Sequence, residues 1–176
     1  MIVDAITVSR GLLRAAHEFL EGTVADVPAD RVHWTPPGAG SSIAANYVHV
    51  LATEDMTVQG LLKGGQPLAA TSWAGKMGVS EPPPMGLGQD LRAWGETARV
   101  ELGPLRQYAQ AVYAATDEFL QSLKPEDLER PYDLSAFGFG QQPMLFLVTN
   151  LLLNPSLHCG EISGLKGLSG ARGYPV

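Results

Sequence analysis

The sequence predicts an all-α protein, a four-helix bundle with a long crossover between its second and third helices. Apolar residues recur at three- and four-residue spacing in four long segments, as on the inner face of a helix. Proline- and glycine-rich stretches separate these segments, and none of the segments alternates apolar and polar residues as a half-buried strand does. The length of 176 residues suits a single domain, predicted over residues 1–176.

The first two helices are indicated by the spacing of their apolar residues and by the residues at their ends. Helical spacing of apolar residues covers residues 5–20, and a loop rich in proline and glycine follows. Ser41 or Ser42 can cap the next helix, because a serine hydroxyl accepts a hydrogen bond from a free backbone N–H of the first turn. That second helix ends at the glycine pair 64–65, since glycine frequently ends a helix.

The connection over residues 66–88 is longer than most loops in a compact domain, which indicates a functional, mobile or surface-wrapped segment. A helical pattern then starts near Asp90 and is interrupted at the Gly-Pro pair 103–104, where proline suits a first helical turn. The helix that follows ends at Pro125. Its predicted inward stripe consists of Leu105, Tyr108, Val112, Ala115, Phe119 and Leu123.

The last helix is predicted from about Pro143 to Gly167, and its length makes it the fourth long helix of the bundle. Pro155 lies inside it and predicts a kink at Asn154, because proline disfavours helical geometry at the preceding residue. The apolar side of this helix is predicted to comprise Leu145, Val148, Leu152, Ile162 and Leu165.

Composition excludes several classes of function. The net charge of −6 and the lack of a Lys/Arg cluster argue against binding to nucleic acid, which requires contacts to phosphates. No apolar run has the length of a membrane span, and no signal peptide is indicated, so a membrane partner is not expected. The single cysteine, Cys159, excludes an intrachain disulfide framework and suits a reducing, cytoplasmic location.

Two histidines fall on predicted inward helix faces. His49 has Ala45 and Ala52 on its side of the second helix, and His158 shares a face with Asn154 in the last helix. Histidines on facing helices can share a metal ion, although a single core histidine is more often satisfied by one hydrogen bond. With Asn154 as third ligand the site would bind a metal ion more weakly than a site of three histidines, because an amide oxygen is neutral and hard.

The other candidate groups are weaker. Glu54 and Glu161 could serve as carboxylate ligands, but a solvated or supporting acid is the commoner role for such residues. His17 and His33 have no ligand spacing to another histidine. Cys159 is interpreted as a small buried residue, because nothing in the sequence indicates a lowered thiol pKa.

Two segments resemble the DinB-like family. WTPPGAGSSIAANYVHVLATED, residues 34–55, is similar to the family's Trp-x-Pro turn and following helix with an inward histidine. LHCGEISGLKGLSGARGYPV, residues 157–176, is similar to its closing helix, which reads His-x-Gly-Glu/Gln-Ile. The resemblance implies a four-helix bundle, commonly paired as a homodimer, and a cytoplasmic protein related to transferases and isomerases that use mycothiol or bacillithiol.

The resemblance also implies a divalent metal, zinc or nickel, held by one histidine of the second helix and two of the fourth. His49 matches the first of these ligands and His158 the last, while Asn154 stands where the remaining histidine is expected.

Two functions remain open from the sequence. The first is a metal-dependent enzyme, a thiol-dependent S-transferase or a hydrolase, that acts on a small molecule or a low-molecular-weight thiol. The second is a metal-free, catalytically silent bundle that binds a small molecule or serves as a dimeric interaction protein. No residue is assigned a catalytic role, because fold resemblance alone does not define the chemistry of a site.

Overall fold

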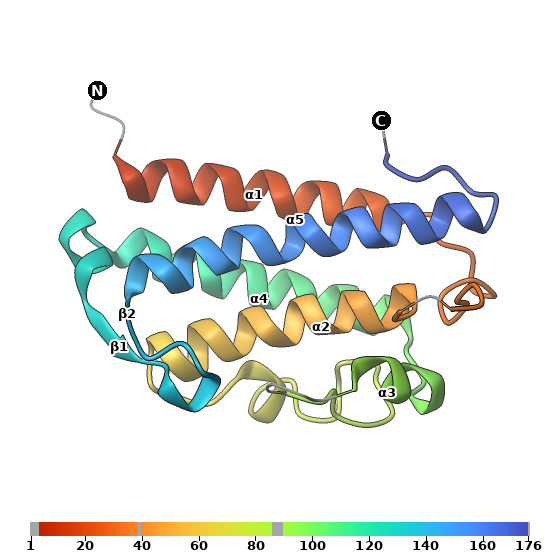
Figure 1. Cartoon of the computed structure of the whole chain (residues 1–176), viewed down its shortest axis with the longest axis horizontal. Helices are drawn as coiled ribbons and strands as arrows, with labels where there is room; N and C mark the ends of the chain where they lie inside the picture. The colour runs from red at the N-terminus through yellow and green to blue at the C-terminus, as the bar shows by residue number, and fades with distance from the viewer. Residues whose placement is uncertain (1–3, 39, 86–89, 176) are drawn as a thin grey trace.

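The computed structural model of the protein describes residues 4–38, 40–85 and 90–175. Its four long helices confirm the all-α bundle (Figure 1). They are α1 (Ala5–Val24), α2 (Ile43–Asp55), α4 (Leu102–Ser122) and α5 (Met144–Leu168). A short helix, α3 (Leu91–Thr97), precedes α4, and α2 continues into a π-helical stretch, Met56–Leu62.

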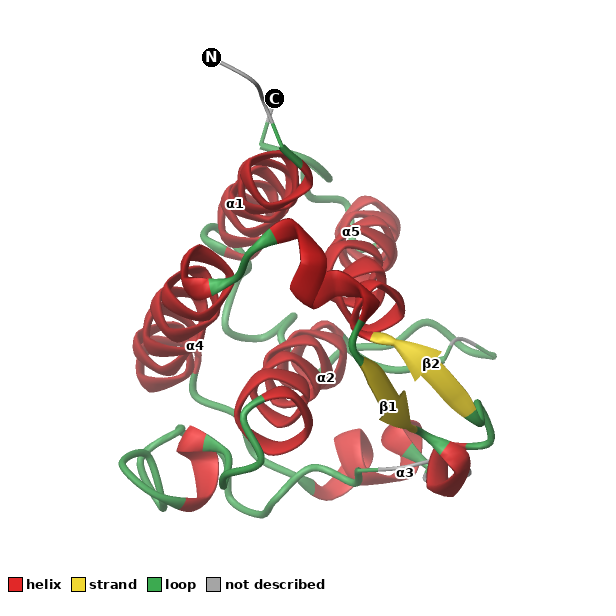
Figure 2. Ribbon diagram, turned by 90° about the vertical axis from the view of Figure 1, so that its left-hand side faces the viewer, coloured by secondary structure: helices red, strands yellow, loops and turns green. Residues whose placement is uncertain are grey.

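The four long helices stand at the corners of a square when the bundle is viewed end on (Figure 2). Each of α1 and α2 packs against both α4 and α5, so α1 and α2 face each other across the diagonal of the bundle. Any side-chain contact between α1 and α2 therefore crosses the bundle interior.

Capping side chains mark the starts of three helices. The hydroxyl of Ser42 accepts a hydrogen bond from the N–H of Ala45, which confirms the predicted cap of α2. Asp4 caps α1 and Asp90 caps α3 through their carboxylates in the same way.

The apolar core forms two clusters stacked along the bundle axis. One is centred on residues such as Leu51, Tyr108 and Ile162, and the other on residues such as Val58 and Leu147. Both clusters draw on α1, α4 and α5, and the first also draws on α2 while the second draws on the π-helical stretch that continues α2.

Part of the predicted apolar stripes is wrong. On α4 the stripe holds as far as Val112, but beyond it Thr116 and Leu120 are buried while Phe119 is only partly buried. On α5 Leu145 is half exposed. A helix that contacts two neighbours buries a wide arc, and a single row of residues cannot describe such an arc.

The crossover between α2 and α4 is tied to the bundle at two places. A 3₁₀ turn, Leu68–Ala70, lies over the end of α2, and Val79 forms an isolated antiparallel bridge with Val100 before α4. Residues 86–88 of the predicted connection lie outside the described residues. The described part of this connection therefore follows the surface of the bundle (Figure 1).

A small hairpin precedes α5 and was not predicted. Strands β1 (Pro131–Asp133) and β2 (Gln141–Pro143) pair antiparallel, with Tyr132 opposite Gln142. The sequence gives no strand signal here, because each strand has three residues and one of them is proline.

Within the described ranges, no helix combines the length and the hydropathy that a membrane crossing requires.

Candidate functional site

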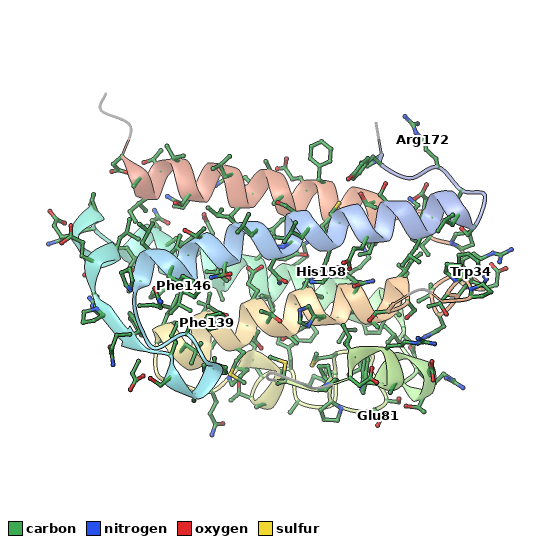
Figure 3. All side chains as sticks on the ribbon, viewed as in Figure 1. Trp34, Glu81, Phe139, Phe146, His158 and Arg172 are labelled. Carbon is green, nitrogen blue, oxygen red and sulfur yellow. The ribbon has the colours of Figure 1, made fainter. Side chains whose placement is uncertain are left out.

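The structure brings His49 of α2 and His158 of α5 into contact. Their ring centroids lie 4.9 Å apart, with the edge of one ring toward the face of the other. Both side chains are partly buried at the interface of the two helices, where His158 is visible between α5 and α2 (Figure 3). The two histidines that sequence spacing predicted to face inward therefore form one site.

His158 is held by two oxygen acceptors. Its Nδ1 lies 2.9 Å from Oε2 of Glu161 and 3.1 Å from Oδ1 of Asn46. Two acceptors at one nitrogen indicate that Nδ1 carries the proton, which leaves Nε2 of the neutral ring as an acceptor. Glu161 is thus a supporting acid that orients the imidazole, one of the roles predicted for it.

His49 is kept neutral by its surroundings. Burial lowers the pKa of its imidazole, and the neighbouring His158 lowers that pKa further, while Glu161 opposes the shift. Near neutral pH His49 therefore offers one N–H donor and one nitrogen acceptor to a bound molecule.

Asn154 lies beside this pair but is turned to the backbone. Its amide Nδ2 donates to the carbonyl oxygen of Val50 at 3.4 Å, a long hydrogen bond that crosses from α5 to α2. The α5 helix stays helical through Pro155, whose side chain is buried.

Glu54 is not part of the histidine pair. Its side chain is 1% exposed, and its Oε2 lies 2.9 Å from Nε2 of His17 on α1, across the diagonal of the bundle. Residues five apart on an α-helix point about 140° away from each other, so Glu54 and His49 face different directions. That spacing was the sequence signal against Glu54 as a ligand.

His17 is a functional candidate that the sequence reasoning missed. It is buried, pairs with Glu54 and stacks on Tyr113 at a centroid distance of 3.7 Å. Its position three residues before Leu20 and four after Leu13, both buried, was the available signal that it lies on the inner face of α1.

The remaining histidine and the cysteine have structural roles. Nε2 of His33 accepts the backbone N–H of Val100. Cys159 is buried with its Sγ 3.3 Å from Oγ1 of Thr23, and burial raises the pKa of its thiol. A raised pKa disfavours the nucleophilic thiolate, in keeping with the packing role expected from the sequence.

The donor set at the histidine pair does not fit a resident zinc or nickel ion. A catalytic zinc site has three protein ligands, whereas two imidazoles meet here and the third position holds the neutral amide of Asn154. Among the described residues, no three His, Cys, Asp or Glu side chains are placed to share a metal. The two acids considered as carboxylate ligands, Glu54 and Glu161, are each paired with a histidine.

Two cavities lie along α2 and α5, and His158 lines one of them, whereas His49 lines neither. One, of about 480 Å³, is lined by residues that include Asn46, His158 and Glu161. The other, of about 200 Å³, is lined by the polar or acidic residues Thr53, Glu54, Thr57, Asn150 and Asn154 and by three leucines. We call this region the α2–α5 groove. No lysine or arginine is present among the described residues that line the two cavities.

Comparisons with known proteins agree with the fold. The model of the DinB superfamily matches residues 12–162. A solved structure described as the conserved protein of locus from Enterococcus faecalis is similar with a TM-score of 0.80 and 19% sequence identity. That similarity covers 95% of this chain and 98% of the other, and at this identity it concerns the fold alone. No curated protein matches this chain.

Proposed function

This chain belongs to the DinB superfamily, and we propose that its α2–α5 groove binds a small, neutral, polar molecule without a resident metal ion. The observation that carries this proposal is the side chain at the third ligand position. Asn154 supplies an uncharged amide there, and that amide is engaged with the carbonyl of Val50. The groove therefore presents hydrogen-bonding side chains at the positions where the family resemblance implies metal ligands.

The side chains of the groove favour an uncharged ligand. His158 lines the groove and is fixed by Glu161 and Asn46 so that its Nε2 can accept a hydrogen bond, while burial keeps the neighbouring His49 neutral. Because no cationic side chain lines the groove among its described residues, an anionic ligand would lack a counter-charge. Amide and hydroxyl groups of a small amide or polyol complement these donors and acceptors.

The alternative is a divalent-metal enzyme, a thiol-dependent S-transferase or a hydrolase. One observation favours it: the contact between Glu161 and His158 has the form of the carboxylate–histidine pair that orients metal ligands. In that case His49 and His158 would be ligands, with Asn154 as a weak third. The two functions differ in metal content, which makes them separable by measurement.

The first test is elemental analysis of protein purified without chelators and without a nickel column. We expect less than stoichiometric metal in the wild type and a gain of zinc or nickel in Asn154→His, because the variant completes a three-imidazole set. His49→Ala in the Asn154→His background should lose that metal again. Stoichiometric metal in the wild type that disappears in His49→Ala would overturn the proposal and support the enzyme.

The second test is binding of acetamide and glycerol, followed through the ring resonances of the histidines by NMR. We expect the signals of His49 and His158 to shift on titration and that of His33, which is bonded to the Val100 backbone, to stay constant. The His158→Ala variant should lose the response. Equal shifts at all histidines, or none at millimolar probe, would count against a polar ligand in this groove.

We also propose that the protein forms a homodimer through the outer face of α1. Val8, Leu12 and Phe19 lie on α1 with about half of each side chain exposed. Leu12 and Phe19 border a cavity of about 400 Å³ together with Cys159 and Tyr174 near α5. Exposed apolar side chains grouped on one face are typical of an interface.

Light scattering tests the dimer. The wild type should show twice the chain mass of 18.7 kDa, and Leu12→Glu combined with Phe19→Glu should show the single mass. Leu168→Glu, at an exposed apolar position at the end of α5, is the matched control and should remain dimeric. A wild-type mass near 18.7 kDa at micromolar concentration would refute the dimer.

A further inference from the structure

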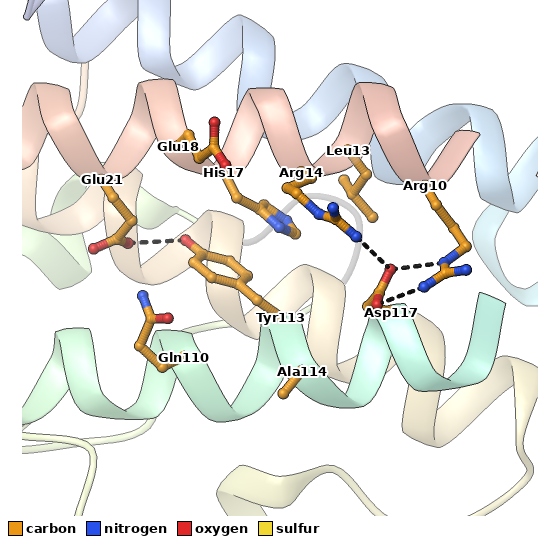
Figure 4. Close-up of a pocket in the computed structure, with 10 residues that line it drawn as sticks. All are labelled: Arg10, Leu13, Arg14, His17, Glu18, Glu21, Gln110, Tyr113, Ala114 and Asp117. Atoms are coloured by element: carbon orange, nitrogen blue, oxygen red, sulfur yellow. Dashed lines mark hydrogen bonds and ion pairs between the residues drawn. The ribbon is translucent and has the colours of Figure 1, made fainter. Parts of the chain in front are cut away.

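A second groove lies between α1 and α4, on a different side of the bundle from the α2–α5 groove (Figure 4). Its volume is about 380 Å³, within the roughly 300–1,000 Å³ that small-molecule sites occupy. The residues that line it include His17 and Leu13 of α1 and Tyr113 and Ala114 of α4. The imidazole of His17 projects from α1 into the space beside the Tyr113 ring (Figure 4).

His17 is backed by a buried carboxylate. Nε2 of His17 lies 2.9 Å from Oε2 of Glu54, which comes from α2 on the far side of the interior and is 1% exposed. Oε1 of Glu54 has no hydrogen-bond partner among the described residues. A buried carboxylate with so few donors needs the Nε2 proton of His17, and this contact fixes the tautomer of the neutral ring.

The tautomer leaves Nδ1 of His17 as a hydrogen-bond acceptor. No hydrogen bond to Nδ1 is formed by the described residues, and Nδ1 is not among their solvent-inaccessible polar atoms without a partner. Because His17 lines the groove, this nitrogen is reached from the groove. Histidines that bind a ligand or accept a proton share this geometry. A buried acid orients the imidazole, and the other ring nitrogen is accessible.

Several of the neighbouring polar groups are already occupied. The hydroxyl of Tyr113 donates to Glu21 at 3.0 Å, and Glu21 also accepts from Arg106. Burial, with the nearby Tyr47 and Glu21, raises the pKa of Tyr113 well above its usual value, so this hydroxyl stays protonated. At the other end of the groove Arg10 makes two contacts with Asp117 (Figure 4).

We propose that the α1–α4 groove is a second binding site, which takes a small phenol whose hydroxyl donates a hydrogen bond to Nδ1 of His17. The aromatic ring of the ligand would lie against Leu13, Ala114 and the Tyr113 ring, which supply the apolar surface. A phenol is a strong O–H donor and matches an acceptor nitrogen. Arginines and acids both line the groove, so charge alone does not select the ligand, and an anion without a proton cannot donate to this nitrogen.

The test compares phenol with anisole on the wild-type protein. The two molecules share the ring, but anisole has no O–H. Titrations followed by NMR should shift the ring resonances of His17 with phenol, and anisole should bind about tenfold more weakly, the effect of one lost hydrogen bond. Equal affinity of the two probes, a response at His158 in place of His17, or no binding at millimolar concentration would overturn the proposal.

Two variants complete the test. His17→Gln should lose the discrimination between phenol and anisole, provided that its circular dichroism matches the wild type. His158→Ala, altered in the α2–α5 groove, should keep the wild-type affinity for phenol, and loss of phenol binding there would assign the probe to the other groove. Because the comparison of phenol with anisole uses the wild type, it remains decisive even if His17→Gln does not fold.

Discussion

At the scale of single residues, Glu21 is a partly buried charge that is stabilised by several donors. The carboxylate of this α1 residue accepts hydrogen bonds from the hydroxyls of Tyr47 and Tyr113 and from the guanidinium of Arg106. These partners come from α2 and α4, so one side chain connects three helices. Hydrogen bonds of this kind offset the cost of withdrawing a carboxylate from water.

Removing one of these donors should destabilise the protein measurably. Tyr47→Phe should lower the free energy of unfolding by about 2 kcal/mol, because it removes a hydrogen bond to a charged acceptor at a fully buried site. Urea unfolding measures the change. Tyr132→Phe is the matched control, since its hydroxyl lies 3.5 Å from the carbonyl of Leu62, and it should cost less than about 0.5 kcal/mol. Similar losses in both variants would contradict the prediction.

His49 should make stability depend on pH. Its pKa is lowered in the fold by burial and by His158, relative to an ordinary value of 6.5. Below that value the unfolded chain binds a proton that the folded protein resists, so the free energy of unfolding should fall as pH decreases through 6.5. The loss should be smaller in His49→Gln, measured by urea unfolding at neutral and mildly acidic pH. An identical pH dependence in the two proteins would refute this assignment.

At the scale of elements, the crossover is fixed by one carboxylate at the end of α2. Asp55 accepts the backbone N–H groups of Leu68 and Ala69, each at 2.9 Å, and the hydroxyl of Tyr108 at 2.7 Å. A carboxylate that accepts two backbone N–H groups acts as the cap of the 3₁₀ turn. The long connection is therefore an ordered strap where it leaves α2, and this explains how the chain returns to α4 without a further long helix.

Asp55→Ala should release this strap. The expected loss in the free energy of unfolding is about 3 kcal/mol, since three hydrogen bonds to a buried carboxylate disappear. Limited proteolysis should then cleave the connection between residues 63 and 85 faster than in the wild type. Asp90→Ala removes a cap of α3 with one backbone hydrogen bond and should cost only about 1 kcal/mol. Unchanged proteolysis in Asp55→Ala would show that other contacts hold the strap.

At the scale of the whole molecule, the two apolar clusters share long helices of the bundle. The cluster that contains Tyr108 also contains Trp94 and borders Trp73, whereas the cluster that contains Leu147 has no tryptophan. The helices α1, α4 and α5 each contribute to both clusters, so neither cluster can unfold without disrupting the other.

Unfolding should therefore be a single cooperative transition. Tryptophan fluorescence, which reports on one cluster, and far-ultraviolet circular dichroism, which reports on all helices, should give the same midpoint in urea. Two separate midpoints would show independent units and would contradict the single domain predicted over residues 1–176.

The local features of the fold could be read from the sequence because they depend on neighbouring residues. Helical spacing, the Ser42 cap and the glycines after α2 are local signals, and the four helices occur where they predicted. The hairpin of β1 and β2 was not predictable, since strands of three residues carry too short a pattern. The positions of buried side chains in the second half of α4 were also missed, because they depend on two packing partners.

The sequence by itself determined the family resemblance and the order of the helices, and helical periodicity placed His49 and His158 on inner faces. That their rings meet was decided by the tertiary structure. Only the tertiary structure decided the partners of the acids. Glu54 pairs with His17 across the diagonal of the bundle, and Glu161 pairs with His158. The rotation of each helix about its axis determines such contacts, and packing of all four helices sets that rotation.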